Sequence, residues 1–333
     1  MTTTGTTPQT DASAGAPPSA IEIAARGNEV TGLSIFNRTS SEDDIDEARV
    51  MELMTEMTSD VPTGGTNFVY GEDDAHHLHF WKGTSTRTPL IVFVHGGSWR
   101  AGTHLDYIGS KKVGRLTAKG YAFATVNFRL VPVVTVEEQV QDVADAVGYL
   151  VMNAANLGFD PDQVILMGHS SGAHVVTLMG TDTRYLGRAG VSIDVIKGII
   201  SLDGSNFNAL AEITDSPGNV AQNLISALGT DAGRLRAMSP TWHARAPNAQ
   251  NFLLLHVMRQ GDIRQAVEFS AVLSAAGTNN ALHVFEGEGF EGHVQMLLRL
   301  GDEAYPATSI LDGWLEQYVS AAHLPAASPS GLD

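Results

Sequence analysis

Short hydrophobic runs recur along the chain and alternate with segments of helical periodicity. The first run, Leu90 to Val94, reads LIVFV, and the later ones cover 121–128, 164–167, 199–202, 252–257 and 282–285. Runs without polar alternation are typical of strands buried on both faces. Strands that alternate with helices in this way predict a parallel sheet covered by helices on both sides. The chemistry of such sheets lies at the carboxyl ends of the strands.

The clearest helix follows Thr135. Thr135 and Glu138 have the spacing of a capping box, and Gly158 supplies a stop signal. Between them the hydrophobic positions recur at intervals of three and four, at Val136, Val140, Val143, Val147 and Leu150. We expect one amphipathic helix that begins after Thr135 and ends by Gly158.

Segments of different composition flank this body. Residues 1–20 have almost no large hydrophobic side chains, and 324–333 are rich in Pro, Ala and Ser. Neither can bury enough surface to offset its ordering entropy, so we predict a disordered tail at each end. The basic start and hydrophobic stretch of a secretory signal are missing from residues 1–20, which favours a cytoplasmic location.

Residues 21–65 are expected to form a helical arm. Ser40 or Ser41 would cap a helix with an acidic first turn, and hydrophobic positions recur at helical spacing as far as Met57. We interpret the arm as packing on the main body, residues 66–323. Because methionine adapts to varied shapes, a flap over an active site or a homodimer surface is also compatible with it. Within the body, 204–250 is a long connection with short helical patterns, expected to form a small lid or pocket wall.

Composition excludes several classes of function. Of the 333 residues, 43% are hydrophobic and 17% charged, so a large core is available. The formal net charge of −17 would repel nucleic acid and anionic membranes. The lack of cysteine excludes disulfides, thiolate metal sites and a cysteine nucleophile. No run approaches eighteen hydrophobic residues, so no membrane span is expected.

The strand at 164–167 leads into Gly168-His169-Ser170-Ser171-Gly172, which has the pattern G-x-S-x-G. Between a strand and a helix, this pattern predicts a sharp turn that lifts the Ser170 hydroxyl clear of the sheet. The Ser171 amide then points into the same space at a helix N-terminus, where negative charge is favoured. We interpret Ser170 as a nucleophile and His169 as packing beside it or lining the pocket.

The first strand is followed by His95-Gly96-Gly97-Ser98-Trp99. Adjacent glycines let a backbone approach a substrate closely, and preorganised amides stabilise the oxyanion that forms when a carbonyl is attacked. We predict an oxyanion hole formed by the amides of Gly97, Ser98 and Ser171. Trp99 is expected to help set the size of the substrate.

A serine nucleophile needs a base and an orienting acid, which must follow later strands. His293, after the strand at 282–285 and the loop 287–292, is the predicted base. Asp262 is the only carboxylate between Asp231 and Glu268, so it is our choice of acid. Asp203, at the end of the strand at 199–202, is the alternative. The order Ser, Asp, His is that of α/β-hydrolases.

From about Asn67 to Ala322 the chain resembles α/β-hydrolase-fold serine esterases with an HGG-x-W loop. Carboxylesterases of the hormone-sensitive-lipase group, feruloyl-esterase-like proteins and kynurenine formamidases share that loop. Further similarities are 126–132 (VNFRLVP) and Met238-Ser239-Pro240. The resemblance implies a mostly parallel sheet of about eight strands flanked by helices, with a small lid. It also implies the triad Ser170, His293 and Asp262. The chain departs from it at Ser98, where many relatives have a third glycine, and in 256–262, which is longer than the usual H-G-x-x-D.

Two other patterns carry less weight. The glycines from Gly287 to Gly292 match a dinucleotide fingerprint, but Glu288 and Glu291 between them would repel a pyrophosphate. His76, His77 and His79 lie in a probable strand without a residue that completes a metal site. We therefore predict neither a cofactor nor a metal.

Together these features predict a serine hydrolase that cleaves a small or medium carboxylic ester through an acyl-enzyme. The predicted partner is a small-molecule ester. An arylformamidase with the same triad is the alternative, and a catalytically silent binding protein on the same fold is a second class.

Overall fold

The computed structural model describes Met1 and residues 47–84 and 87–319. The chain divides into two units, 1–40 and 41–333, and every element below belongs to the second. The predicted tails at 1–20 and 324–333, and the predicted start of the arm helix near Ser40, lie outside the described residues.

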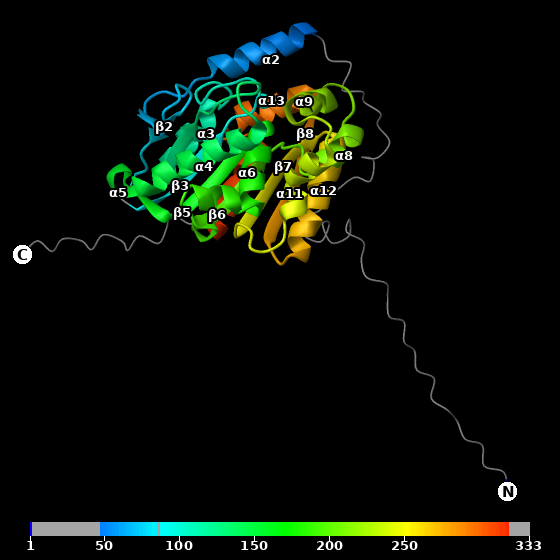
Figure 1. Cartoon of the computed structure of the whole chain (residues 1–333). Helices are drawn as coiled ribbons and strands as arrows, with labels where there is room; N and C mark the ends of the chain where they lie inside the picture. Colours follow the sequence, from blue (N-terminus) through cyan, green and yellow to red (C-terminus); the bar gives the residue numbers. More distant parts are fainter. Residues whose placement is uncertain (2–46, 85–86, 320–333) are drawn as a thin grey trace, which may run out of the picture. The chain divides into compact units, whose positions relative to one another are not determined.

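An eight-stranded sheet forms the centre of the second unit (Figure 1). Its strands are β1 (Thr66–Val69), β2 (His77–Trp81), β3 (Thr88–Val94), β4 (Ala122–Val126), β5 (Phe159–His169), β6 (Ile196–Leu202), β7 (Asn251–Met258) and β8 (Asn279–Glu288). They lie in the order β1-β2-β4-β3-β5-β6-β7-β8, with β2 antiparallel to both neighbours and the other pairs parallel. The predicted α/β-hydrolase architecture is confirmed, and the six hydrophobic runs correspond to β3 to β8.

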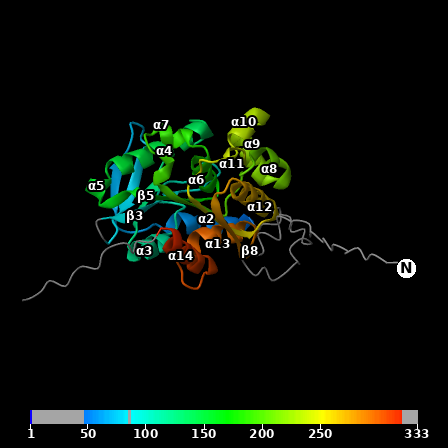
Figure 2. The ribbon, with the colours of Figure 1, turned by 90° about the horizontal axis from the view of Figure 1, so that it is seen from below.

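Helices cover both faces of the sheet (Figure 2). They are α2 (Glu47–Ser59), α3 (Ser110–Ala118), α4 (Val136–Met152), α5 (Ala154–Leu157), α6 (Ser171–Thr181), α7 (Arg184–Arg188), α8 (Ala209–Asp215), α9 (Asn219–Leu228), α10 (Ala232–Ala237), α11 (Pro240–His243), α12 (Gln260–Ala275), α13 (Gly289–Arg299), α14 (Pro306–Tyr318) and a 3-10 turn, η2 (Ile193–Val195). Within the described ranges, none is both long and hydrophobic enough to cross a bilayer.

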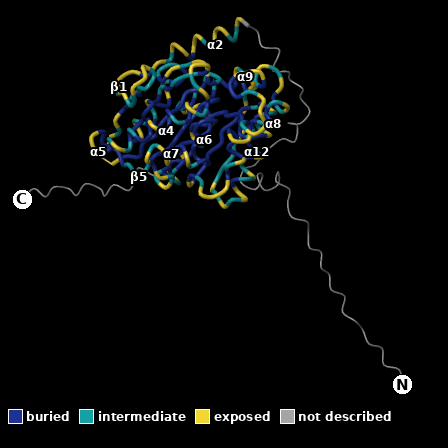
Figure 3. Tube along the Cα trace, in the orientation of Figure 1, coloured by how far each residue is buried: buried dark blue, intermediate teal, exposed yellow. Residues whose placement is uncertain are grey.

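The alternation of side chains along β3 divides the core into two layers. Leu90, Val92 and Val94 pack with α4, α6 and α12, whereas Ile91 and Phe93 pack with α3, α13 and α14. All five side chains are fully buried, and Figure 3 shows the buried interior that results. A strand with both faces covered requires hydrophobic residues at every position, which explains its unbroken run.

The helix predicted after Thr135 has the expected start and an unexpected break. Glu138 N donates to Thr135 Oγ1 at 3.3 Å, and Thr135 N donates to Glu138 Oε2 at 2.8 Å, so the capping box is confirmed. The prediction of one helix as far as Gly158 is wrong, because α4 ends at Met152 and a short α5 follows. Gly158, in the left-handed conformation at φ 82°, closes α5.

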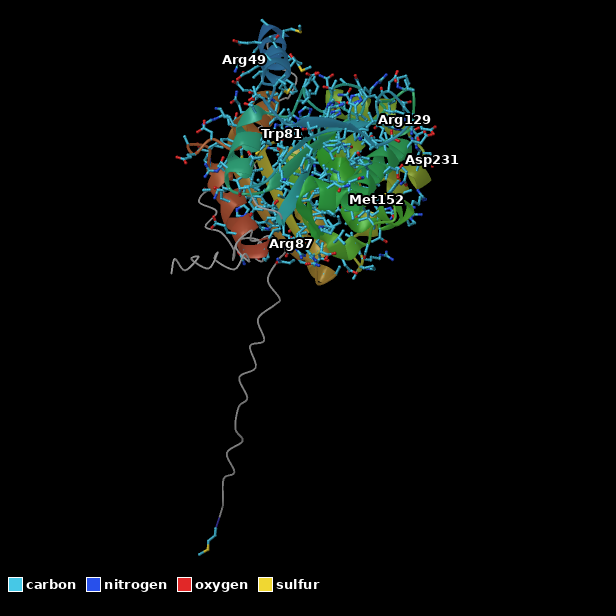
Figure 4. All side chains as sticks on the ribbon, turned by 90° about the vertical axis from the view of Figure 1, so that its left-hand side faces the viewer. Arg49, Trp81, Arg87, Arg129, Met152 and Asp231 are labelled. Carbon is cyan, nitrogen blue, oxygen red and sulfur yellow. The ribbon has the colours of Figure 1, made fainter. Side chains whose placement is uncertain are left out.

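The arm helix α2 lies at the carboxyl end of the parallel strands. Figure 4 shows Arg49 on α2 and Arg87, which precedes β3, at opposite ends of this unit. Leu53 and Met57 are buried in the layer that includes α13, and Arg49 pairs with Glu291 of α13 at 2.5 Å. α2 is therefore anchored to the helix that carries His293.

Candidate active site

Ser170 occupies a strained turn between β5 and α6. Its backbone angles, φ 55° and ψ −125°, lie outside the regions that ordinary residues prefer. Such a tight turn requires close packing beside it. A Cβ on Gly172 would lie 2.2 Å from the carbonyl oxygen of Val94, so only glycine fits there. The strand, the strained serine and the helix have the arrangement that G-x-S-x-G predicts.

The loop after β3 folds against this turn. Gly97, Ser98 and Trp99 have positive φ angles of 117°, 52° and 61°. The Trp99 amide donates to Ser171 Oγ at 3.3 Å, and a Cβ on Gly96 would come within 2.8 Å of Ser170 Cβ. The residues predicted for the oxyanion hole therefore lie on the loop and the turn that meet at Ser170.

His293 lies inside α13 and not in the loop before it. β8 continues to Glu288 and α13 begins at Gly289, so the expected loop at 287–292 is wrong. Gly289 and Gly292 belong to the first turn of α13, where packing on the core outweighs the low helix propensity of glycine.

Two buried side chains hold α13 in place. His169 Nε2 lies 3.0 Å from the carbonyl oxygen of His293, and the two imidazole rings are 4.3 Å apart. Lys112 donates to the carbonyls of Ile108 and Leu297, which joins α3 to α13. Burial lowers the pKa of Lys112 to about 7. His293 thus lies beside the residue that immediately precedes Ser170.

Asp203 makes the contact that an orienting acid requires. Its Oδ2 lies 2.5 Å from His293 Nδ1, and its Oδ1 accepts the Val257 amide at 3.1 Å. The residue directly follows β6, has a strained φ of 44° and is fully buried. Burial by itself would raise the pKa of this carboxyl group. The charge of Arg259 and the adjacent His256 and His293 outweigh that effect and hold the pKa well below its usual value.

Asp262, our choice from the sequence, pairs with Arg259. It is in the first turn of α12, fully buried, and its Oδ2 pairs with Arg259 Nη2 at 2.8 Å. The usual H-G-x-x-D spacing, counted from His256, ends at Gln260, so the chain has no carboxylate at that position. The alternative from the sequence, Asp203, is in contact with His293.

Sequence reasoning also missed Arg259, which lies among these groups. Its Nη1 donates to Asp203 Oδ2 at 2.8 Å and lies 3.2 Å from His293 Nδ1. An arginine directly after the buried strand β7 is the signal that could have drawn attention to it, because a buried charge needs a partner.

The two residues expected to meet substrate are both buried. Trp99 is 4% exposed, its carbonyl accepts from Gln139 Nε2 at 2.7 Å, and its ring packs edge-on to His174. His169 is 3% exposed and supports α13 as described. In the part of the chain that the structure describes, no group of three or more histidine or carboxylate side chains could hold a metal ion, and this includes the histidines of β2.

Comparisons with known proteins agree with this fold. A thermophilic esterase from Thermogutta terrifontis superposes with a TM-score of 0.59 at 22% identity, covering 76% of this chain and 92% of that one. A probable isoprenylcysteine alpha-carbonyl methylesterase of Oryza sativa subsp. japonica is 25% identical over 66% of this chain and 56% of its own. A kynurenine formamidase of Meyerozyma guilliermondii is 33% identical over 31% of this chain and 38% of its own. The chain thus spans about half the length, or less, of these two relatives.

The fold and the similarities confirm the resemblance to α/β-hydrolase-fold serine esterases and kynurenine formamidases. Residues 77–259, more than half of the chain, match the BD-FAE family, and the chain belongs to it.

Proposed function

We propose that this protein is a serine hydrolase of carboxylic esters, with Ser170 as nucleophile, His293 as base and Asp203 as orienting acid. The observation that carries the proposal is the 2.5 Å contact between Asp203 and His293 beside the strained turn of Ser170. The esterases among its relatives support the ester as the substrate class.

The mechanism follows from these positions. His293 takes the Ser170 proton through Nε2 while Nδ1–H donates to Asp203, which fixes the tautomer and stabilises the imidazolium. Ser170 Oγ attacks the ester carbonyl, and the amides of Gly97, Ser98 and Ser171 stabilise the oxyanion. His293 then protonates the leaving alcohol, and water releases the acid from the acyl-enzyme. We assign the limits on substrate size to α2 and to residues 204–250, which contain α8 to α11.

An arylformamidase is the second candidate, supported by the formamidase relative. It would use the same groups on an N-formyl amide. Parallel assays with p-nitrophenyl acetate, p-nitrophenyl butyrate and N-formylkynurenine distinguish the two, since the better substrate has the higher kcat/KM. A fluorophosphonate probe tests both against a silent binding protein, which would leave Ser170 unlabelled.

Gly97→Ala is expected to lower kcat by about 10²-fold, because a displacement of about 1 Å in a catalytic group has an effect of this size. A Cβ at this position would lie 2.1 Å from the Ala101 carbonyl oxygen, on a residue whose φ of 117° disfavours any side chain. The loop must therefore shift and take its amides with it. Steady-state kinetics with p-nitrophenyl butyrate measure the loss.

Gly313→Ala on α14 is the matched control, because a Cβ there meets nothing within 4 Å. It should retain the wild-type kcat. Unchanged kcat in Gly97→Ala would remove this loop from the proposed mechanism.

A further inference from the structure

We propose that Arg259 is a positioning residue that shares one oxygen of Asp203 with His293 and so keeps the imidazole unprotonated at lower pH than Asp203 alone would allow. The inference rests on the proposed function, because it assigns His293 the role of base. It adds a fourth residue, which carries a permanent positive charge, to the triad.

The geometry places two donors on a single acceptor. Asp203 Oδ2 lies 2.8 Å from Arg259 Nη1 and 2.5 Å from His293 Nδ1, and these two nitrogens are 3.2 Å apart. A guanidinium stays protonated throughout the working range of an enzyme. Arg259 therefore neutralises part of the Asp203 charge and also repels a positive charge on the imidazole directly.

The position of Arg259 is fixed from both sides. Its Nη2 pairs with Asp262 at 2.8 Å, in the first turn of α12, while Nη1 pairs with Asp203 after β6. The Arg259 side chain is 9% exposed and both carboxylates are buried, so water screens these charges little. Asp262 thus holds the guanidinium that contacts His293.

Other titratable groups surround the pair. They include His169 of β5, 4.3 Å from the His293 ring; His256 of β7, 3.5 Å from Asp203 Oδ1; Lys112 of α3, at the Leu297 carbonyl of α13; Glu291 of α13, paired with Arg49 of α2; the buried Glu212 of α8, on which the charge of Arg259 acts; and Tyr305, on which the charge of Asp203 acts. Burial and the neighbouring His293 lower the pKa of His169 well below its usual value, so it adds no positive charge near neutral pH. Arg259 is a cation in direct contact with both Asp203 and His293.

The test is the pH dependence of kcat/KM. The fall of kcat/KM at low pH, its acid limb, reports the protonation of His293. In Arg259→Gln, the loss of the positive charge favours the imidazolium, so this acid limb should move to higher pH by about one to three units. Arg259→Lys keeps the charge and should restore most of the wild-type limb. Arg259→Gln/Asp262→Asn removes the ion pair as a unit, leaves no buried charge at the start of α12, and should still show the upward shift.

Two further measurements make the result decisive. Arg115→Gln breaks a comparable pair with Asp312, 2.6 Å apart and formed between α3 and α14, and should leave the acid limb unchanged. The His293 imidazole is also titrated by NMR in the Ser170→Ala protein, with and without Arg259→Gln, which needs no catalysis. An upward shift of the NMR titration with an unmoved kinetic limb supports the role of Arg259 and contradicts His293 as base. If the NMR titration of His293 stays in place in folded Arg259→Gln and in the double variant, Arg259 has no such role.

Discussion

Ser170→Ala should lose ester hydrolysis by about 10⁶-fold, because the attacking oxygen is removed while the fold is kept. Ser170 follows β5 in a backbone conformation that an alanine tolerates as well as serine does. The binding site and the oxyanion loop would remain, so a small residual rate above that in water is expected. Hydrolysis of p-nitrophenyl butyrate and labelling by a fluorophosphonate probe both measure the loss.

The matched control is Ser309→Ala, a serine on α14 whose hydroxyl donates to the Pro306 carbonyl. It should retain wild-type activity and labelling. Wild-type hydrolysis by Ser170→Ala, in protein purified free of host esterases, would refute Ser170 as nucleophile.

Asp203→Asn should lower kcat by about 10⁴-fold at pH 8, whereas Asp262→Asn should lower it by less than about tenfold. The side-chain amide introduced by Asp203→Asn would present a donor to His293 Nδ1. It would favour the tautomer with its proton on Nε2, which cannot accept the Ser170 proton. Asp262 pairs with Arg259, so its replacement acts on His293 only indirectly. Steady-state kinetics of the two variants, with thermal unfolding to verify the fold, test this order.

A loss confined to Asp262→Asn would return the orienting role to the residue that the sequence suggested. Asp262→Asn also tests the proposed role of Arg259. Without its second carboxylate, the guanidinium would act more strongly on Asp203, and the acid limb of kcat/KM should move slightly to lower pH.

The local parts of the site could be predicted from the sequence because short-range sterics specify them. Ser170 with Gly168 and Gly172, placed after a buried strand, has few conformations other than the observed turn. Short-range sterics specify the glycine loop after β3 in the same way. The parallel sheet followed from the continuous hydrophobic runs, because burial on both faces leaves no polar position.

The choice between the two acids depended on distances across the sheet. β6 and β7 are neighbouring parallel strands, and Leu202 lies opposite Leu255. Asp203, which follows Leu202, therefore lies directly beside the end of β7. β7 pairs in turn with β8, which leads into α13 and brings His293 to the same edge. Spacing along the chain could not show which acid contacts His293. Asp262 is close to His256 in sequence, but its position in the first turn of α12 directs it toward Arg259.

The sequence alone therefore determined the fold class, the strand-turn-helix around Ser170 and the glycine loop that meets it, since each depends on neighbours a few residues apart. Only the tertiary structure decided which carboxylate faces His293, where α13 begins and that Arg259 enters the group. Those outcomes depend on strand order and on the pairing of buried charges, and both are set by residues that are far apart along the chain.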